Sequence, residues 1–227
     1  MALTVATLFS SCTRNRVSDI IQRAEQGDAV SQLAYGRLLK TTGQGVDQDW
    51  AKSVEMLQLA ADAGNSDAQW ELGLMYEYAN HVDEDQPRAL SLYRSSADAG
   101  NPIGLYLVAH CYQHGIVVDE DTAVSDSLYQ ASFVQLQQLA PAEDIYVLNF
   151  IGSAYFWGDG VAVDRQKAFG YYLTSAKKGN PETQYKVGNC YEMGQGVAKD
   201  RQEAERWYRR SADQGFPEAI DALERFQ

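Results

Sequence analysis

Small and apolar residues recur along the chain at the spacing of one helix face. Near the C-terminus they stand at Thr183, Val187, Gly188 and Tyr191, with polar residues between them. Steps of three or four residues return a side chain to the same side of a helix, so this pattern predicts a helix over residues 182–193. A second periodic segment follows and ends at Gly215. The pattern therefore predicts two helices joined by a short loop.

This helix pair recurs about every 36 residues, which is typical of a helical repeat array. One small residue marks the same position in the first helix of each pair; these residues are Gly36, Gly73, Ala109, Gly152 and Gly188. Because glycine costs a helix about 1 kcal/mol relative to alanine, we expect another helix to pass close to these positions. The connecting loops over 43–49, 158–164 and 194–200 contain glycine, valine and a final Asp that would cap the next helix.

The ends of the array are predicted to be half-repeats. Residues 17–26 have the pattern of an isolated second helix, and residues 218–226 that of an isolated first helix. The third repeat departs most, since its second helix is lengthened through Leu139. The sequence predicts an all-α protein, a right-handed α-solenoid of about five helix pairs with flanking half-repeats over 17–227, preceded by an N-terminal segment over 1–16.

The order of these residues resembles the Sel-1-like repeat, a relative of the tetratricopeptide repeat. The pattern A-x₃-LG-x₂-Y-x₂-G-x-GV-x₂-D-x₃-A-x₂-WY-x₂-A-x₂-G is almost complete in the last repeat, residues 181–215. The resemblance implies a bacterial protein that binds another protein and is not an enzyme. Two roles follow: an immunity protein that neutralises a secreted toxin, such as a lipase of type VI secretion, or an adaptor or scaffold in signalling or envelope assembly. The compact acidic array favours the first.

Negative charge is concentrated in the middle of the chain. The net charge is −12, and residues 65–130 carry eleven acidic but only two basic side chains. Nucleic-acid binding needs a basic surface, so the composition argues against it. The acidic block either keeps the protein soluble or attracts a partner with a basic surface.

Two acidic triplets occupy the same loop of consecutive repeats: Asp83, Glu84 and Asp85, and then Asp119, Glu120 and Asp121. A helix dipole favours negative charge at its first turn, which explains one Asp in each loop. It does not require three. We therefore take all six as candidate contacts for a basic partner, with helix capping as the alternative.

Other candidate contacts lie on the first helices, at positions outside the repeat pattern. They are Trp70, Glu77, Tyr78, Tyr106, His110, His114, Phe156, Trp157 and Tyr185. Exposed aromatic side chains often anchor protein interfaces. Alternatively, Trp70, Tyr106 and Tyr185 share one register and pack between neighbouring helices.

The sequence contains no phosphate loop, nucleophile elbow, HExxH or CxxC pattern, so we expect neither catalysis nor a cofactor. The Gly-x-Gly-Val loops follow no strand and are explained as turns between helices. His110 and His114 share a helix face near Cys111, but Cys111 points about 100° away. We read the two histidines as surface residues and predict no metal site.

Cys12 stands apart from the other cysteines. It follows an apolar stretch ending in two serines, and polar residues come after it. This resembles the end of a bacterial lipoprotein signal, although no Lys or Arg precedes the apolar stretch. We expect a lipid anchor on Cys12 and a periplasmic or outer-membrane location; the alternative is a cytoplasmic protein with a partly buried N-terminal segment.

Overall fold

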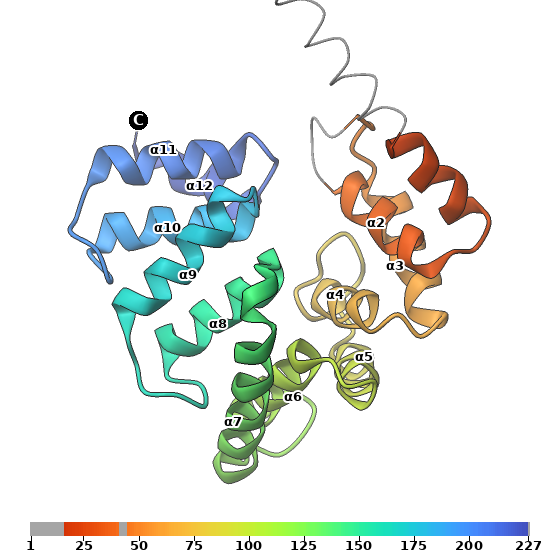
Figure 1. Cartoon of the computed structure of the whole chain (residues 1–227), viewed down its shortest axis with the longest axis horizontal. Coiled ribbons are helices and arrows are strands. Elements are labelled where there is room, and N and C mark those ends of the chain that lie inside the picture. Colours follow the sequence, from red (N-terminus) through yellow and green to blue (C-terminus); the bar gives the residue numbers. More distant parts are fainter. Residues whose placement is uncertain (1–15, 41–44, 227) are drawn as a thin grey trace, which may run out of the picture. The chain divides into compact units, whose positions relative to one another are not determined.

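The computed structural model describes residues 16–40 and 45–226, and every regular element in these ranges is a helix (Figure 1). Residues 16–25 are helical. The following helices are α2 (Ala29–Leu39), α3 (Trp50–Asp62), α4 (Ser66–Glu77), α5 (Gln86–Asp98), α6 (Pro102–His114), α7 (Thr122–Leu139), the short 3₁₀ helix η1 (Ala140–Ala142), α8 (Ile145–Trp157), α9 (Arg165–Lys177), α10 (Pro181–Met193), α11 (Arg201–Ala212) and α12 (Pro217–Glu224).

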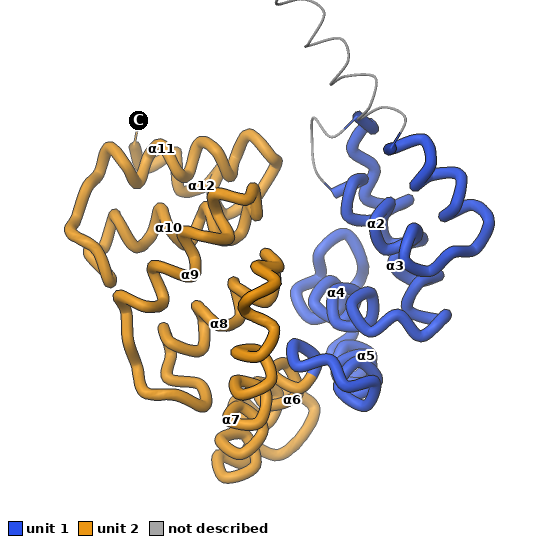
Figure 2. The backbone as a smooth tube through the Cα atoms, viewed as in Figure 1, with its two compact units in different colours: residues 1–104 blue, residues 105–227 orange. Residues whose placement is uncertain are grey.

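The chain forms two compact units, residues 1–104 and 105–227 (Figure 2). In the first unit, α2 packs against α3, α4 packs against α5, and α3 contacts α4. In the second, α8 packs against α9 and α10 against α11, while α7 contacts α8, α9 contacts α10 and α11 contacts α12. Each helix pair thus buries its apolar face against a sequence neighbour, which is the packing of an α-solenoid. This confirms the predicted all-α fold class.

The small residue in the first helix of a pair is where the second helix comes closest. A Cβ atom built on Gly188 would lie 2.5 Å from Cε1 of Tyr208, and one built on Gly73 would lie 2.5 Å from Cε1 of Tyr93. A real Cβ atom does not fit at that distance, because carbon atoms pack about 3.5–4.0 Å apart. The prediction that another helix approaches these glycines is confirmed.

The loop inside each pair ends in an aspartate that caps the second helix. The side chains of these aspartates accept hydrogen bonds from backbone N–H groups of the first helical turn; the residues are Asp49, Asp85, Asp121, Asp164 and Asp200. The backbone N–H of each also donates to a carbonyl near the end of the first helix, at 2.9–3.0 Å. The same two bonds therefore tie the start of the second helix to the end of the first in all five repeats.

The ends of the array agree with the sequence pattern. The predicted half-repeats correspond to the helical residues 16–25 and to α12, and the lengthened helix of the third repeat is α7, with 18 residues. The predicted N-terminal segment, with Cys12, falls outside the described residues apart from Arg16. Within residues 16–40 and 45–226, no helix has the length and apolar character needed to cross a membrane.

Candidate protein-binding surfaces

In the acidic loop of the first unit, one carboxylate caps a helix and the other two are exposed. Asp85 accepts a hydrogen bond from the backbone N–H of Arg88 at 3.0 Å and so caps α5. Asp83 and Glu84 are exposed, and Glu84 accepts a hydrogen bond from Gln86 at 2.9 Å. Neither forms an ion pair with a described Lys, Arg or His side chain.

The loop of the second unit has the same arrangement. Asp121 caps α7 by accepting from the backbone N–H of Val124 at 2.9 Å, whereas Asp119 and Glu120 are exposed. No ion pair joins these two carboxylates to a cation in the described part of the chain. In both loops, capping explains one carboxylate and leaves two facing solvent.

Three of the predicted contact residues are buried. Trp70 is only 3% exposed and its indole N–H donates to Asp67 at 3.3 Å, while Glu77 is buried and accepts a hydrogen bond from Tyr93. Tyr106 is 6% exposed and donates to Asp159. This corrects the prediction that these three residues contact a partner from an exposed helix face, because helix packing covers their side chains. For Trp70 and Tyr106, the burial agrees with the packing alternative.

The environment of Tyr106 is that of a core residue. Its ring makes edge contacts with Tyr129 and Phe150, with centroids 4.8 and 5.2 Å apart. Burial, together with the nearby Asp159 carboxylate, raises the pKa of Tyr106 well above its ordinary value. Burial also raises the pKa of Asp159, which the Tyr106 hydroxyl and His114 partly offset. The pair therefore joins α6 to the loop after α8.

The two histidines of α6 lie side by side near solvent. Their ring centroids are 4.5 Å apart; His110 is half-buried and His114 is exposed. Among the described residues, no three His, Cys, Asp or Glu side chains gather in a group that would hold a metal ion.

The remaining aromatic candidates differ in exposure. Tyr78 is 65% exposed at the end of α4, and Trp157 is 67% exposed at the end of α8. Phe156 is half-buried, with its ring centroid 4.8 Å from that of Trp157. Tyr185 is half-buried and packs against Tyr208 and Phe216, each with a centroid distance of 5.7 Å. Large exposed aromatic side chains of this kind are suited to a protein interface.

Phe156, Trp157 and Tyr185 come together around a cavity of about 360 Å³ in the second unit. Its walls are formed by α8, α9, α10 and the start of the following loop. The lining residues are Phe156, Trp157, Arg165, Tyr172, Tyr185, Lys186, Asn189, Cys190, Met193 and Gln195. Trp157 and Met193 are exposed at its rim, whereas Tyr172 and Cys190 are buried. Aromatic and aliphatic walls with a few polar groups are typical of ligand pockets.

Two cations line this cavity, but only one is paired. Lys186 contacts Glu182 at 2.7 Å and also donates to Asn149 at 2.8 Å. Burial alone would lower the pKa of Lys186, but Glu182 outweighs it and the net effect is a raised pKa, so the ammonium group stays charged. Arg165 has no carboxylate partner among the described residues.

The guanidinium group of Arg165 is held by aromatic rings. It lies 3.7 Å from the ring centroid of Phe156 and 5.6 Å from that of Trp157. A cation this close to a ring is attracted by the negative charge of the ring face. Nη1 is buried and has no hydrogen-bond partner in the described part of the protein.

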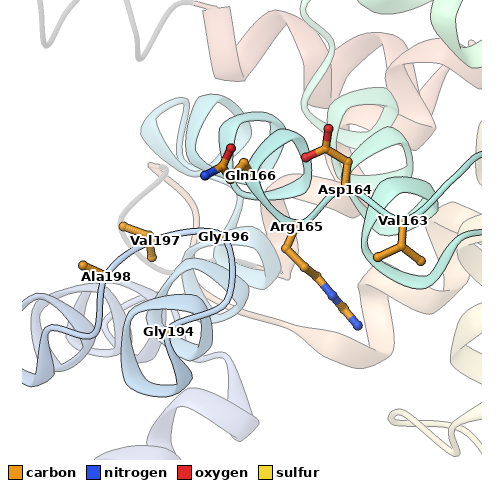
Figure 3. A pocket seen from close by; sticks show the side chains of 8 residues that line it. All are labelled: Val163, Asp164, Arg165, Gln166, Gly194, Gly196, Val197 and Ala198. Atoms are coloured by element: carbon orange, nitrogen blue, oxygen red, sulfur yellow. The ribbon is translucent and has the colours of Figure 1, made fainter.

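Arg165 also borders a second, open cleft of about 490 Å³, where the Gly194–Ala198 loop meets the start of α9 (Figure 3). A Cβ atom on Gly196 would lie 1.9 Å from the carbonyl oxygen of Arg165, so this cleft is a close contact between two consecutive loops. Figure 3 shows the Arg165 side chain directed away from those of Asp164 and Gln166. Since the Asp164 carboxylate already caps α9, the cleft is poorly suited to a phosphate.

Sequence reasoning missed Arg165, Lys186 and Met193 as members of one site. Arg165 directly follows a capping aspartate, where a basic residue looks like an ordinary surface charge. A signal was nevertheless present in the next repeat. There Arg201 follows the cap Asp200 and lies 4.9 Å from the ring centroid of Phe226. Comparing the first helical residue of each repeat would have singled out the two arginines, but not the aromatic rings that they contact.

Comparison with known proteins gives one family. The sequence model of the Sel1 repeat matches residues 29–65, 66–101, 102–125, 146–180 and 181–216, more than half of the chain. No curated protein matches the sequence significantly.

Solved structures share the architecture. A sel1 repeat protein from Klebsiella pneumoniae is 23% identical, with a TM-score of 0.52, over 92% of this chain and 98% of that one. A protective antigen of uropathogenic Escherichia coli is 24% identical, with a TM-score of 0.47, over 94% of this chain; the chain spans 53% of that protein's length. An immunity protein from Pseudomonas aeruginosa is 22% identical, with a TM-score of 0.46, over 84% of this chain and 67% of that one.

Proposed function

Because the chain belongs to the Sel1 repeat family, whose repeats mediate protein interactions, we propose that it binds another protein and catalyses no reaction itself. The observation that carries this proposal is the excess of exposed carboxylates in two equivalent loops. Asp85 and Asp121 cap helices, so their acidic neighbours are not needed as caps. Exposed charged side chains on loops that do not act as caps are candidates for recognition.

The partner is proposed to carry a basic surface. Asp83, Glu84, Asp119 and Glu120 are exposed and lack a cation from the described residues. They lie in a segment, residues 65–130, with eleven acidic and two basic side chains. Such a potential accelerates encounter with a basic protein and repels acidic ones. Tyr78, exposed near the first loop, would add apolar contact area.

In its specific form, the proposal is that this partner is a secreted bacterial toxin, held inactive in an immunity complex. Enzymes that degrade anionic substrates such as phospholipids or nucleic acids attract them with a basic surface, and an acidic array would cover that surface. An adaptor or scaffold role is the alternative, in which the bound protein is not a toxin. A lipid anchor on Cys12 and a periplasmic or outer-membrane location belong to the same proposal. Mass spectrometry of membrane fractions tests them, and an unmodified Cys12 would contradict them.

Co-purification tests the binding surface. The chain is co-expressed in turn with the products of the genes that neighbour its own, and the expected partner among them is a secreted phospholipase or nuclease. A fourfold variant, D83N/E84Q/D119N/E120Q, removes the exposed carboxylates but keeps both caps. A control variant, D98N/D126N/E218Q/D221N, removes four other exposed carboxylates and has the same net charge.

We expect the loop variant to lose the partner and the control variant to retain it, with both keeping the wild-type helical content. Equal retention by the two variants would contradict partner recognition by the exposed carboxylates of these loops. If the bound partner is not a toxin, or if its activity is unchanged in the complex, the adaptor role replaces the immunity role.

A further inference from the structure

The cavity between α8, α9 and α10 supports a more specific proposal about the bound partner. We propose that it binds a carboxylate group of a partner polypeptide, with Arg165 as the residue that recognises the carboxylate and with Phe156, Trp157 and Met193 contacting an adjacent apolar side chain. The inference rests on the protein-binding function proposed above, but not on the acidic loops, which lie elsewhere in the chain.

The unsatisfied donor of Arg165 points to an acceptor in the ligand. Nη1 is buried and has no hydrogen-bond partner among the described residues. Leaving a buried charged donor unpaired is costly, more so than for a neutral group. The Phe156 ring, whose centroid lies 3.7 Å from Cζ of Arg165, restrains the guanidinium group beside the cavity. A carboxylate suits this side chain because it accepts two parallel hydrogen bonds from one guanidinium group.

The charge in the cavity favours a monovalent anion over a phosphate. Lys186 is protonated, but Glu182 lies 2.7 Å away and compensates its charge. Arg165 is therefore the one lining cation whose charge no described carboxylate balances. A phosphate monoester carries close to two negative charges at neutral pH and would bring an excess into a largely apolar cavity. A carboxylate brings one.

The apolar part of the site indicates a polypeptide rather than a small acid. Trp157 and Met193 are exposed at the rim, beside the half-buried Phe156. An exposed pair of large apolar side chains next to a charged pocket favours a ligand in which an apolar residue accompanies the carboxylate. The volume of about 360 Å³ is near the lower end for ligand pockets, so the site would take one or two residues of an extended segment.

The test uses three synthetic peptides and the full-length protein labelled with ¹⁵N. The first, N-acetyl-Leu-Leu, has a free C-terminal carboxylate. The second is the corresponding C-terminal amide, and the third, N-acetyl-Leu-Glu-Leu-amide, has its only carboxylate on a side chain. Each is titrated while the amide, Arg165 Nε–H and Trp157 indole N–H signals are followed by NMR. Two variants are compared: R165Q and, as the control on the same helix, K177Q, which removes an exposed charge from the end of α9.

We expect a peptide with a carboxylate to shift the signals of Arg165 and Trp157 and to bind at least about tenfold more tightly than the amide, the factor expected for one charge-assisted hydrogen bond. The better of the first and third peptides identifies the source as a chain terminus or an acidic side chain. R165Q should lose this preference and K177Q should keep it.

Three results would overturn the inference: equal binding of acid and amide peptides, shifts confined to other parts of the chain, or no binding by any peptide up to millimolar concentration. The acid–amide comparison uses the unmodified protein, so it holds even if R165Q folds poorly. The fourfold acidic-loop variant should bind the carboxylate peptides normally. The co-purification test can therefore fail while the peptide test succeeds, and the reverse, so the two proposals are tested separately.

Discussion

Alanine at position 188 would place a methyl group where the ring of Tyr208 already lies. The built Cβ atom lies 2.5 Å from Cε1 and 2.6 Å from Cδ1 of this fully buried ring. Gly170, in the middle of α9, offers a matched control because a Cβ atom there meets nothing within 4 Å. Both substitutions remove a glycine from a helix, so both gain roughly 1 kcal/mol of helix propensity.

The difference between the two variants isolates the cost of overpacking, since the propensity gain cancels. Forcing a methyl group into a packed core typically costs about 1–3 kcal/mol. We therefore expect G170A to be more stable than wild type by up to about 1 kcal/mol, and G188A to fall below G170A by about 1–3 kcal/mol. G36A should lie between them, because its new Cβ atom would be 3.1 Å from Cγ of Leu57, a less severe contact than that at position 188.

Urea unfolding followed by circular dichroism at 222 nm measures these differences. The assay compares the free energies of unfolding of the four proteins, wild type included. If G188A and G170A unfolded at the same urea concentration, the close approach of Tyr208 would not explain the glycine at position 188. The argument for every small residue in this register would fail with it.

Three further predictions concern single side chains. Burial would raise the pKa of Glu71, but Lys40 and Arg37 hold this pKa below its ordinary value; Nζ of Lys40 lies 2.6 Å from Oε2 of Glu71. The stabilising contribution of the Glu71 carboxylate is therefore present above about pH 4.3 and is lost as the pH falls further. Thermal melts should show that E71Q is less stable than wild type at pH 7, by an amount that shrinks toward pH 3. Replacing the cap Asp200 should destabilise the protein by about 1 kcal/mol as D200A but much less as D200N, since Asn also caps helices, and urea unfolding of the two variants measures this. Burial raises the pKa of the Cys190 thiol to about 11, so iodoacetamide at pH 7.5 should alkylate it only after unfolding, and mass spectrometry showing rapid modification in the native protein would contradict its burial.

The exposure of the aromatic residues shows where sequence reasoning reached its limit. Trp70, Tyr106 and Tyr185 lie three residues before the small residue of their repeats, yet Trp70 and Tyr106 are buried while Tyr185 is half-buried. The ring of Tyr185 packs against Tyr208 and Phe216, and these contacts leave it half-buried. Periodicity indicates which face of a helix a residue occupies, but not how fully a neighbouring element covers it.

Local patterns determined the helix pairs, their loops and their caps, because each depends on residues close together in sequence. Spacing predicted the helices, Gly and Asp predicted the loops, and the small residue predicted a close helix contact; all are present. The tertiary structure decided what those patterns leave open, such as the buried hydrogen bond from Gln184 to the carbonyl of Ala176 that ties α10 to α9. It also brought Arg165 over Phe156 and left Nη1 without an acceptor among residues 16–40 and 45–226. Such features arise from side chains of different helices meeting in space, and a one-dimensional pattern carries no information about that distance.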